Sequence, residues 1–271
     1  LSGGGSALLP APAPGVTLED KQIVTRLLMH AGATIDQLNG VRSCLSRIKA
    51  GGLLRSMAAG RGIALIISDV RGDPLPVIAS GPTVDMTPDP HAALQTLESL
   101  VGLDRVPVRV RRLLEQTPGD LRHAKPIPFR NVIIGNNQTA VAAAARRAQA
   151  LGYEVALQEA DQGGIARDVG RELAGDVLAR RQQSVRGRGW CFLSGGEPVV
   201  QLATTDLPRR GGRNQELVLA ATEHLWEESL EGLVILSGGT DGEDGPTDAA
   251  GALVDADVVQ RARQAGLAPR E

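Results

Sequence analysis

The stretch Ile63-Ala64-Leu65-Ile66-Ile67-Ser68-Asp69 decides the fold class of this chain. Its run of consecutive apolar residues is typical of a parallel strand buried on both faces, because an edge strand would alternate apolar with polar side chains. Similar short apolar runs alternate with Ala- and Leu-rich amphipathic segments along the rest of the sequence. This alternation predicts βαβ units, and we expect an α/β protein with a largely parallel sheet.

The same patterns predict the other elements on either side of this strand. Helices are expected at residues 19–29, with Thr17 as the N-cap, and at 35–46, 91–101, 108–115, 139–151, 165–180, 214–226 and 257–264. Further strands are expected at residues 77–79, 131–134, 154–157, 190–193, 198–202 and 233–236. A stretch rich in Pro, Gly and charge at residues 117–128 indicates a domain boundary, which divides the chain into residues 1–122 and 123–271. The residues from Leu1 onward read as the end of a strand whose beginning is absent, so we expect a fragment.

Composition narrows the class of protein. The chain has 271 residues, with 29 basic against 31 acidic side chains and only two Trp, two Phe and one Tyr. Neither nucleic acid nor an anionic membrane is therefore an expected partner. Because no apolar run approaches the roughly 20 residues of a membrane span and no signal peptide is recognisable, we expect a soluble, cytoplasmic protein. Cys44 and Cys191 are expected to be reduced thiols.

One local pattern, a strand end followed by Ser-Gly-Gly, occurs three times, at Ser2, Ser194 and Ser237. In open α/β sheets, ligands bind outside the carboxyl ends of strands, where glycines let backbone N–H groups approach an anion. A single Gly pair is as well explained by a tight turn. Three such turns after predicted strands favour binding of a phosphate or carboxylate.

Charged side chains near these turns are candidate site residues. Asp69 and Asp73 follow the first strand, and either could hold Mg²⁺ or cap a turn. Arg213 precedes a predicted helix, where it and the free N–H groups of the first turn would face an anion; the alternative is an Asn-capped helix with a solvated arginine. Lys49 stands before two glycines and is either a phosphate ligand or a solvated surface lysine. The carboxylates of residues 240–245 fit Mg²⁺ or a polyol hydroxyl better than an EF-hand, whose ligand order they lack.

Standard nucleotide and hydrolase motifs do not occur in the sequence. None of the three lysines ends a GxxxxGK[ST] motif, and the glycines after Ser2 do not complete GxGxxG. No histidine stands with a G-x-S-x-G elbow, so a catalytic triad is not indicated.

Six segments, in order and spanning nearly the whole chain, resemble the glycerate 2-kinases of the MOFRL type, a family often labelled hydroxypyruvate reductase. They are residues 1–10, residues 41–52 with the core LSRIK, residues 68–83 (SDVRGDPLPVIASGPT), residues 194–198 (SGGEP), residues 212–216 (GRNQE) and residues 237–251 (SGGTDGEDGPTDAAG). The resemblance implies an incomplete Rossmann-like parallel-sheet domain followed by a smaller α/β MOFRL-type domain, with the site in the cleft between them.

The resemblance also implies an activity, the phosphorylation of D-glycerate or a similar sugar acid to 2-phosphoglycerate with ATP and Mg²⁺. Carried over to this sequence, the catalytic residues would be Arg213, Asp241, Asp69 and Lys49, with Asp69 and Asp73 as Mg²⁺ ligands. Substrate would contact Arg47, Asn214 and Asp244. ATP would be held by the glycine turns, that is by Ser2, Gly3, Gly4, Gly5, Ser6, Ser194, Gly195, Gly196, Ser237, Gly238, Gly239 and Thr240.

This sequence departs from the family pattern at several places. An N-terminal region with a GAGK-like loop and a C-terminal continuation are missing, Cys44 stands where His is common, and Ala50 shifts the usual Gly-Gly after Lys49. Losing a lysine that balances phosphate charge would remove several kcal/mol of transition-state stabilisation, so we expect this chain alone to be nearly inactive. Two other functions stay open, an NAD(P)-dependent hydroxypyruvate reductase and a non-catalytic ligand-binding fragment. The sequence leaves the oligomeric state open, including a homodimer.

Overall fold

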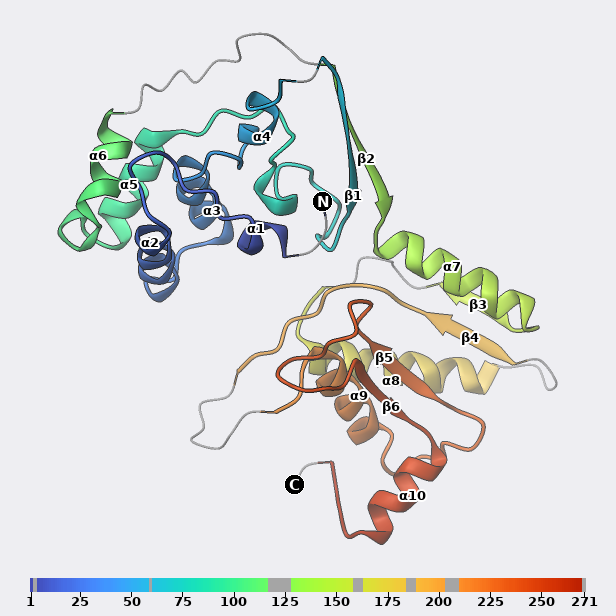
Figure 1. Ribbon diagram of the computed structural model, residues 1–271. Coiled ribbons are helices and arrows are strands. Elements are labelled where there is room, and N and C mark those ends of the chain that lie inside the picture. The colour runs from blue at the N-terminus through green and yellow to red at the C-terminus, as the bar shows by residue number, and fades with distance from the viewer. Residues whose placement is uncertain are drawn as a thin grey trace. The chain divides into compact units, whose positions relative to one another are not determined.

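The computed structural model describes residues 1, 4–58, 60–116, 128–157, 163–183, 189–202 and 210–269. The chain divides into two compact units, Leu1–Asn136 and Asn137–Glu271 (Figure 1). Each unit combines helices with paired strands, which confirms the α/β class. The predicted boundary after residue 122 lies outside the described residues and stays a prediction.

Four helices build the core of the first unit. They are α2 (Leu18–His30), α3 (Ile35–Cys44), α5 (Pro90–Leu100) and α6 (Val108–Gln116). Their apolar faces meet in a buried cluster that includes Val24, Leu28, Val41, Leu97 and Val110. Shorter turns surround them: α1 (Gly5–Leu8), α4 (Gly52–Arg55), η1 (Ile78–Ser80) and η2 (Leu103–Arg105).

The start of α2 confirms a predicted cap. Thr17 Oγ1 accepts a hydrogen bond from the Asp20 amide at 3.1 Å, and the Thr17 amide donates to Asp20 Oδ2 at 2.9 Å. This reciprocal capping box satisfies two N–H groups that the helix itself cannot use, which fixes where α2 begins.

The strand that decides the fold class is β1 (Gly62–Ile67), and it pairs in parallel with β2 (Phe129–Gly135). Leu1 lies on the other side of β1: its amino group donates to the Leu65 carbonyl and its carbonyl accepts from the Ile67 amide, both at 2.8 Å. This is the hydrogen-bonding pattern of a parallel neighbour. β2 therefore belongs to the first unit, although the predicted boundary would assign it to the second region.

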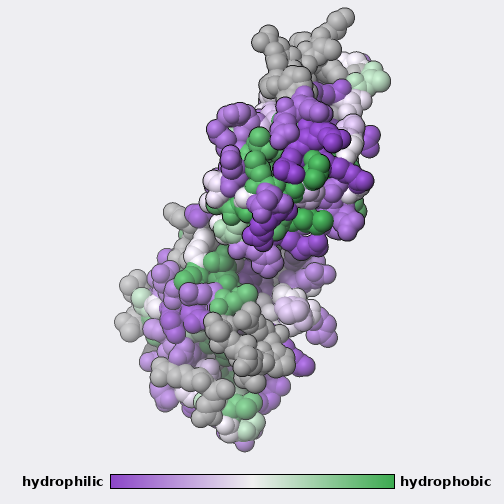
Figure 2. Space-filling view, turned by 90° about the vertical axis from the view of Figure 1, so that its left-hand side faces the viewer, coloured by the Kyte–Doolittle hydropathy of each residue, from purple (hydrophilic) through white to green (hydrophobic). Residues whose placement is uncertain are grey.

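The prediction that β1 is buried on both faces is wrong for the part of the chain that the structure describes. Ala64 and Ile66 are buried beside Ile78, whereas Ile63 and Leu65 on the opposite face are 68% and 55% exposed. Successive side chains of a strand point to opposite faces, and among the described elements the helices and turns cover only one of them. Apolar side chains also reach the surface elsewhere, as Figure 2 shows from one side.

The second unit continues the alternation of helices and strands. Its elements are α7 (Asn137–Ala150), β3 (Glu154–Leu157), α8 (Ala166–Gln183), β4 (Trp190–Leu193), α9 (Arg213–His224), β5 (Ile235–Gly238), β6 (Gly251–Val254) and α10 (Ala256–Gln264). β3 and β4 are parallel, and β5 and β6 are antiparallel. α8 packs on α9 so closely that a Cβ at Gly170 would lie 2.2 Å from the Leu217 carbonyl oxygen.

Two local predictions are wrong, and one strand was not predicted. Residues 77–79 are not extended, because Ala79 and Ser80 adopt left-handed φ values of 52° and 63° inside a 3₁₀ turn. Residues 198–202 form only a single bridge, between Val199 and Ile165, because Val199 is the one residue there that exchanges hydrogen bonds with the segment before α8. β6 was not expected, since its four residues follow a Gly- and Asp-rich loop and are too few to show a pattern. None of the described helices combines the length and apolarity that a membrane crossing requires.

Candidate functional site

Among the described residues of the first unit, Lys49 contacts one other predicted site residue, Ser6. Its side chain is 1% exposed, and its ammonium donates to the Ser6 carbonyl at 2.7 Å, to Ser6 Oγ at 3.1 Å and to Ser80 Oγ at 3.3 Å. The two serine hydroxyls also bond each other at 2.8 Å. The alternative of a solvated surface lysine is therefore wrong. Lys49 joins α1 to the turn at residues 78–81.

Two further cations that the sequence analysis missed surround Lys49. Arg42 donates to the Ser6 carbonyl at 2.8 Å, and Lys21 Nζ donates to the Pro10 carbonyl. Burial, and then repulsion from Arg42 and Lys21, lowers the pKa of Lys49 to about 8. Burial and the charge of Arg42 likewise lower the pKa of Lys21 to about 8. Within the described residues, these three side chains pair only with backbone carbonyls and hydroxyls and with no carboxylate.

A signal in the sequence could have revealed Lys21. It shares the buried face of α2 with Val24 and Leu28, at helical spacing. A lysine on an apolar helix face needs a local partner or a functional reason, because an unpaired buried charge is costly. Arg42 has no comparable signal, since it lies on the half-exposed side of α3.

Strained backbone gathers at the same junction. Ala50, Ala79 and Ser80 all have left-handed φ angles, of 46°, 52° and 63°, which non-glycine residues rarely adopt. The Ala50 amide donates to the Ser80 carbonyl at 2.8 Å, and the Gly51 amide donates to the Gly81 carbonyl at 2.7 Å. Such strain persists only where the surrounding structure enforces it, and it clusters at functional sites. The junction of these loops is the candidate site of the first unit.

The other predicted residues of this unit have separate surroundings. Asp69 is exposed just beyond β1, and Asp73 has a left-handed φ of 54° and accepts a hydrogen bond from Asn136 Nδ2. Arg47 is exposed. Gly4 has a φ of 73° and is followed by Gly5, whose Cβ would lie 2.9 Å from Ala79 Cβ. Ser2 and Gly3 lie outside the described residues.

Asp244 holds together the predicted residues of the second unit. Its side chain is only 2% exposed. Oδ1 accepts from the Asn214 amide and from Asn214 Nδ2, both at 3.0 Å, and Oδ2 accepts from the Gln215 amide at 2.9 Å. Burial raises the pKa of Asp244, but these hydrogen bonds outweigh burial and leave the pKa below its ordinary value. The carboxylate thus caps α9 from a loop 30 positions further along the chain.

This cap corrects an expectation about α9. The N–H groups of Asn214 and Gln215 in the first turn are not free for a bound anion, because the Asp244 carboxylate occupies them. Asn214 Oδ1 also accepts a hydrogen bond from Ser237 Oγ at 2.7 Å. The predicted substrate contacts of Asn214 and Asp244 stay untested, and the structure gives both side chains a role inside the protein.

Arg213 and Asp241 remain accessible beside this cluster. Arg213 is 41% exposed and donates to Glu197 of the turn after β4 at 2.8 Å. Asp241 is exposed, and its Oδ1 accepts from the Glu243 amide at 3.3 Å. These two side chains can reach a ligand without rearrangement of the core.

The glycine turns follow strands as predicted. Ser194, Gly195 and Gly196 come directly after β4, while Ser237 and Gly238 end β5. The Gly239 amide is not available to an anion, because it donates to the Ala250 carbonyl at 2.7 Å. Thr240 is exposed in the following loop.

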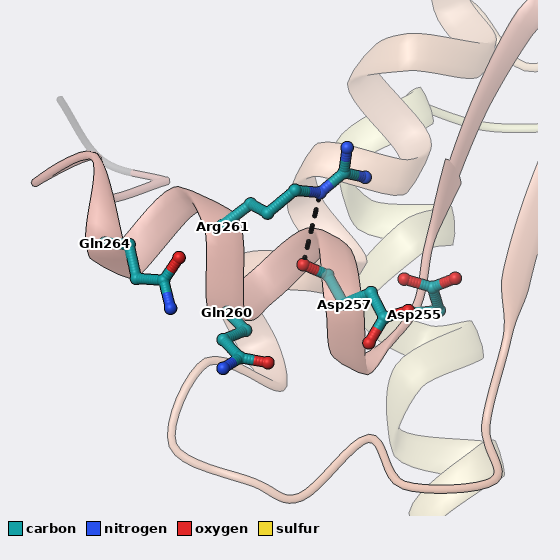
Figure 3. A pocket seen from close by; sticks show the side chains of 5 residues that line it. All are labelled: Asp255, Asp257, Gln260, Arg261 and Gln264. Atoms are coloured by element: carbon teal, nitrogen blue, oxygen red, sulfur yellow. Dashed lines mark hydrogen bonds between the residues drawn. The ribbon is translucent and has the colours of Figure 1, made fainter.

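A hollow in the described surface, beside α10, contains none of the predicted site residues. Its volume is about 520 Å³, and Figure 3 shows side chains of α10 and its cap around it: Asp255, Asp257, Gln260, Arg261 and Gln264. The structure therefore joins Lys49 to Ser6 in the first unit. In the second unit it joins Asp244 to Asn214 and, through Asn214, to Ser237. Convergence of the two groups on one gap stays a prediction.

Comparisons with known proteins identify the family of this chain. Residues 1–115 match the family described as "Domain of unknown function (DUF4147)", and residues 190–271 match the MOFRL family. A glycerate kinase from Macaca fascicularis is 41% identical over 98% of this chain and 77% of its own length. A glycerate 2-kinase from Pyrococcus horikoshii is 38% identical over 98% of this chain and 60% of its own length.

A solved structure gives the same relationship in three dimensions. The crystal structure of a glycerate kinase from Thermotoga maritima matches all of this chain with a TM-score of 0.83 and 36% identity, while the chain spans 63% of that protein. The identity and coverage of these relatives extend over both units. The chain belongs to the MOFRL-type glycerate kinase family.

Proposed function

We propose that the whole protein transfers the γ-phosphoryl group of ATP to the 2-hydroxyl of D-glycerate. The P–O bond to the β-phosphate breaks, a P–O bond to the glycerate oxygen forms, the hydroxyl proton leaves to a base, and ADP and 2-phosphoglycerate are released. The observation that carries the proposal is 41% identity to a protein named glycerate kinase over 98% of this chain. Because the chain spans 58% to 77% of the lengths of its glycerate kinase relatives, the activity is proposed for the whole protein.

Arg213 is the residue we propose to hold transferring phosphate charge. Among the described residues its guanidinium makes one hydrogen bond, to Glu197, and the side chain is 41% exposed. A guanidinium has five N–H donors in a planar fork that matches phosphate oxygens, so donors remain for a ligand. Asp241, exposed in the loop after β5, is proposed to orient or deprotonate the substrate hydroxyl.

The carboxylates after β1 are proposed to contribute to a Mg²⁺ site. The described residues contain no cluster of three or more His, Cys, Asp or Glu side chains suited to a metal. Mg²⁺ bound with substrate needs only one or two carboxylates, because water and phosphates supply its other ligands, and the exposed Asp69 and nearby Asp73 fit that donor set. When bound, Mg²⁺ would neutralise charge on the transferring phosphate.

Lys49 has a different proposed role from the one expected. Its ammonium is enclosed by Ser6 and Ser80, so it acts on the glycine turn from inside the protein and fixes the backbone that would face the phosphates. We further propose a cytoplasmic location, in keeping with the free thiols of Cys44 and Cys191.

A coupled assay of ADP release tests the proposal. The full-length protein is incubated with ATP, Mg²⁺ and D-glycerate, and phosphorus NMR identifies the product as 2- or 3-phosphoglycerate. We expect ADP and 2-phosphoglycerate, and a rate about 100-fold lower in Arg213→Lys, because one charge-stabilising fork is lost. Oxidation of NADH by hydroxypyruvate without ADP release from glycerate would replace the kinase proposal with the reductase.

A further inference from the structure

We infer that Asp244 is a positioning residue, whose carboxylate holds the loop bearing Asp241 against the first turn of α9, next to Arg213. The functional part of this inference rests on the proposed kinase activity. It differs from the substrate contact expected for Asp244, because it assigns the carboxylate to the interior of the protein.

The first support is the location of the carboxylate. Asp244 is 2% exposed, and three donors of Asn214 and Gln215 bind its two oxygens at 2.9 to 3.0 Å. A charged acceptor at a helix N-terminus satisfies amides that would otherwise be buried without partners, and the helix dipole stabilises its charge. A ligand could reach these oxygens only by displacing the start of α9.

The second support is that other residues of the Asp244 loop also contact the start of α9. Thr247 Oγ1 donates to the Asp244 carbonyl at 2.8 Å, and Gln215 Nε2 donates to Thr247 Oγ1 at 3.1 Å. A Cβ at Gly212 would lie 2.4 Å from Asp244 Oδ1, and one at Gly245 would lie 2.2 Å from the Gly211 carbonyl oxygen. Backbone and side chain thus enforce one arrangement of the loop on α9.

The third support is that this arrangement positions the two proposed catalytic residues, Arg213 and Asp241. Arg213 is the first residue of α9 and directly precedes Asn214, while Asp241 stands three positions before Asp244 in the loop. Asp241 is exposed and Arg213 is partly exposed, whereas the Asp244 carboxylate that links their segments is buried. An error of about 1 Å between catalytic groups can cost on the order of 100-fold in rate, so such a link matters to catalysis.

The test compares Asp244→Asn with Asp248→Asn in the full-length protein. Asn has the same size but replaces one acceptor oxygen with an N–H₂ donor, which leaves the Gln215 amide without a partner. Asp248 is exposed on the same loop, so its substitution removes the same charge without touching α9. Hydrogen exchange of α9 and of residues 239–250 is measured together with kcat and the KM for D-glycerate.

We expect Asp244→Asn to exchange at least about tenfold faster at the Gln215 amide and in the loop, and to lower kcat about 10- to 100-fold with less than about a threefold change in KM. Asp248→Asn should match the wild type in both measurements. A raised KM with unchanged exchange would make Asp244 a substrate ligand and overturn the inference, as would unchanged exchange and unchanged kcat.

Two provisions keep the outcome clear. Should Asp244→Asn fail to fold, Thr247→Val removes the neighbouring bonds to Gln215 and to the Asp244 carbonyl, and it should change exchange and kcat in the same direction by less. Should the wild type lack kinase activity, the proposed function fails, and hydrogen exchange alone still decides whether Asp244 holds the loop.

Discussion

Lys49 shows how a single residue can be recognised from the sequence and yet be assigned the wrong surroundings. Its position before two glycines marked it as a phosphate ligand or a surface residue. The structure instead encloses the ammonium between Ser6 and Ser80, with Arg42 bound to the same Ser6 carbonyl. A buried cation that joins two segments contributes to stability as well as to any function of those segments.

We predict that Lys49→Met destabilises the protein by about 2 to 3 kcal/mol, because hydrogen bonds from a charged donor are lost and the Ser6 carbonyl keeps fewer partners. Urea denaturation measures the change. The exposed Arg47 provides the control, and Arg47→Met should change the free energy of unfolding by less than about 0.5 kcal/mol. Equal effects of the two substitutions would contradict the enclosed geometry.

The lowered pKa values of Lys49 and Lys21 predict a pH dependence. Both fall from 10.5 to about 8 in the folded protein, so between these values the unfolded chain binds more protons than the folded chain. The free energy of unfolding is therefore lowest below about pH 8, where both lysines are charged in both states, and it rises with pH up to about 10.5. Unfolding free energies at pH 7 to 10 should show the wild type gaining relative to Lys49→Met. A difference that is constant or of opposite sign would contradict the assignment.

At the scale of elements, α8 and α9 pack closely together in the second unit. A Cβ at Gly170 would meet the backbone of Leu217, whereas a Cβ at Gly175, also in α8, would meet no atom within 4 Å. Alanine substitutions at the two glycines therefore distinguish two effects. The change at Gly175 tests only helix propensity, whereas the change at Gly170 also tests the packing of α8 on α9.

We predict that Gly170→Ala destabilises the protein by about 1 to 3 kcal/mol, because the two helix backbones must move apart. Gly175→Ala should be neutral or stabilising by up to about 1 kcal/mol, since alanine is the better helix former and nothing obstructs it. Thermal unfolding of both variants measures the effects. Stabilisation by both would show that α8 and α9 are further apart than described.

An element could be predicted from the sequence when the residues that stabilise it lie close to it along the chain. Thr17 and Asp20 fix the start of α2 within four residues, and Thr17 was predicted as its N-cap. By contrast, Asp244 caps α9 from 30 positions away, so no local pattern could assign its role. Residues 198–202 looked like a strand, but whether a strand forms depends on a partner elsewhere in the chain.

At the scale of the whole molecule, both units carry regions of one family. The DUF4147 region covers residues 1–115 and the MOFRL region covers residues 190–271. The sequence alone supported the family because its six motifs occur in order. It could not show that Lys21 and Arg42 share the junction of Lys49, since helix packing brings them together.

Ligand binding should be measurable as thermal stabilisation of the full-length protein. A nucleotide that binds only the folded state at about 100 times its Kd stabilises it by about 2.7 kcal/mol. We predict that ATP with Mg²⁺ raises Tm by several degrees, and that Arg213→Lys and Asp69→Asn reduce the shift. NADH should give none. A shift that is unchanged in both variants would remove Arg213 and Asp69 from the proposed site.

The enclosure of its lysines has a practical consequence for chemical modification of this protein. Only Lys21, Lys49 and Lys125 carry ε-amines, and the first two are 7% and 1% exposed. Acylating reagents attack the neutral, accessible amine, so in the native state both groups should be labelled at the rate at which the helices around them open. The acylation rates of these two amines, followed by mass spectrometry, would therefore report how often the first unit opens locally. No engineered probe is needed.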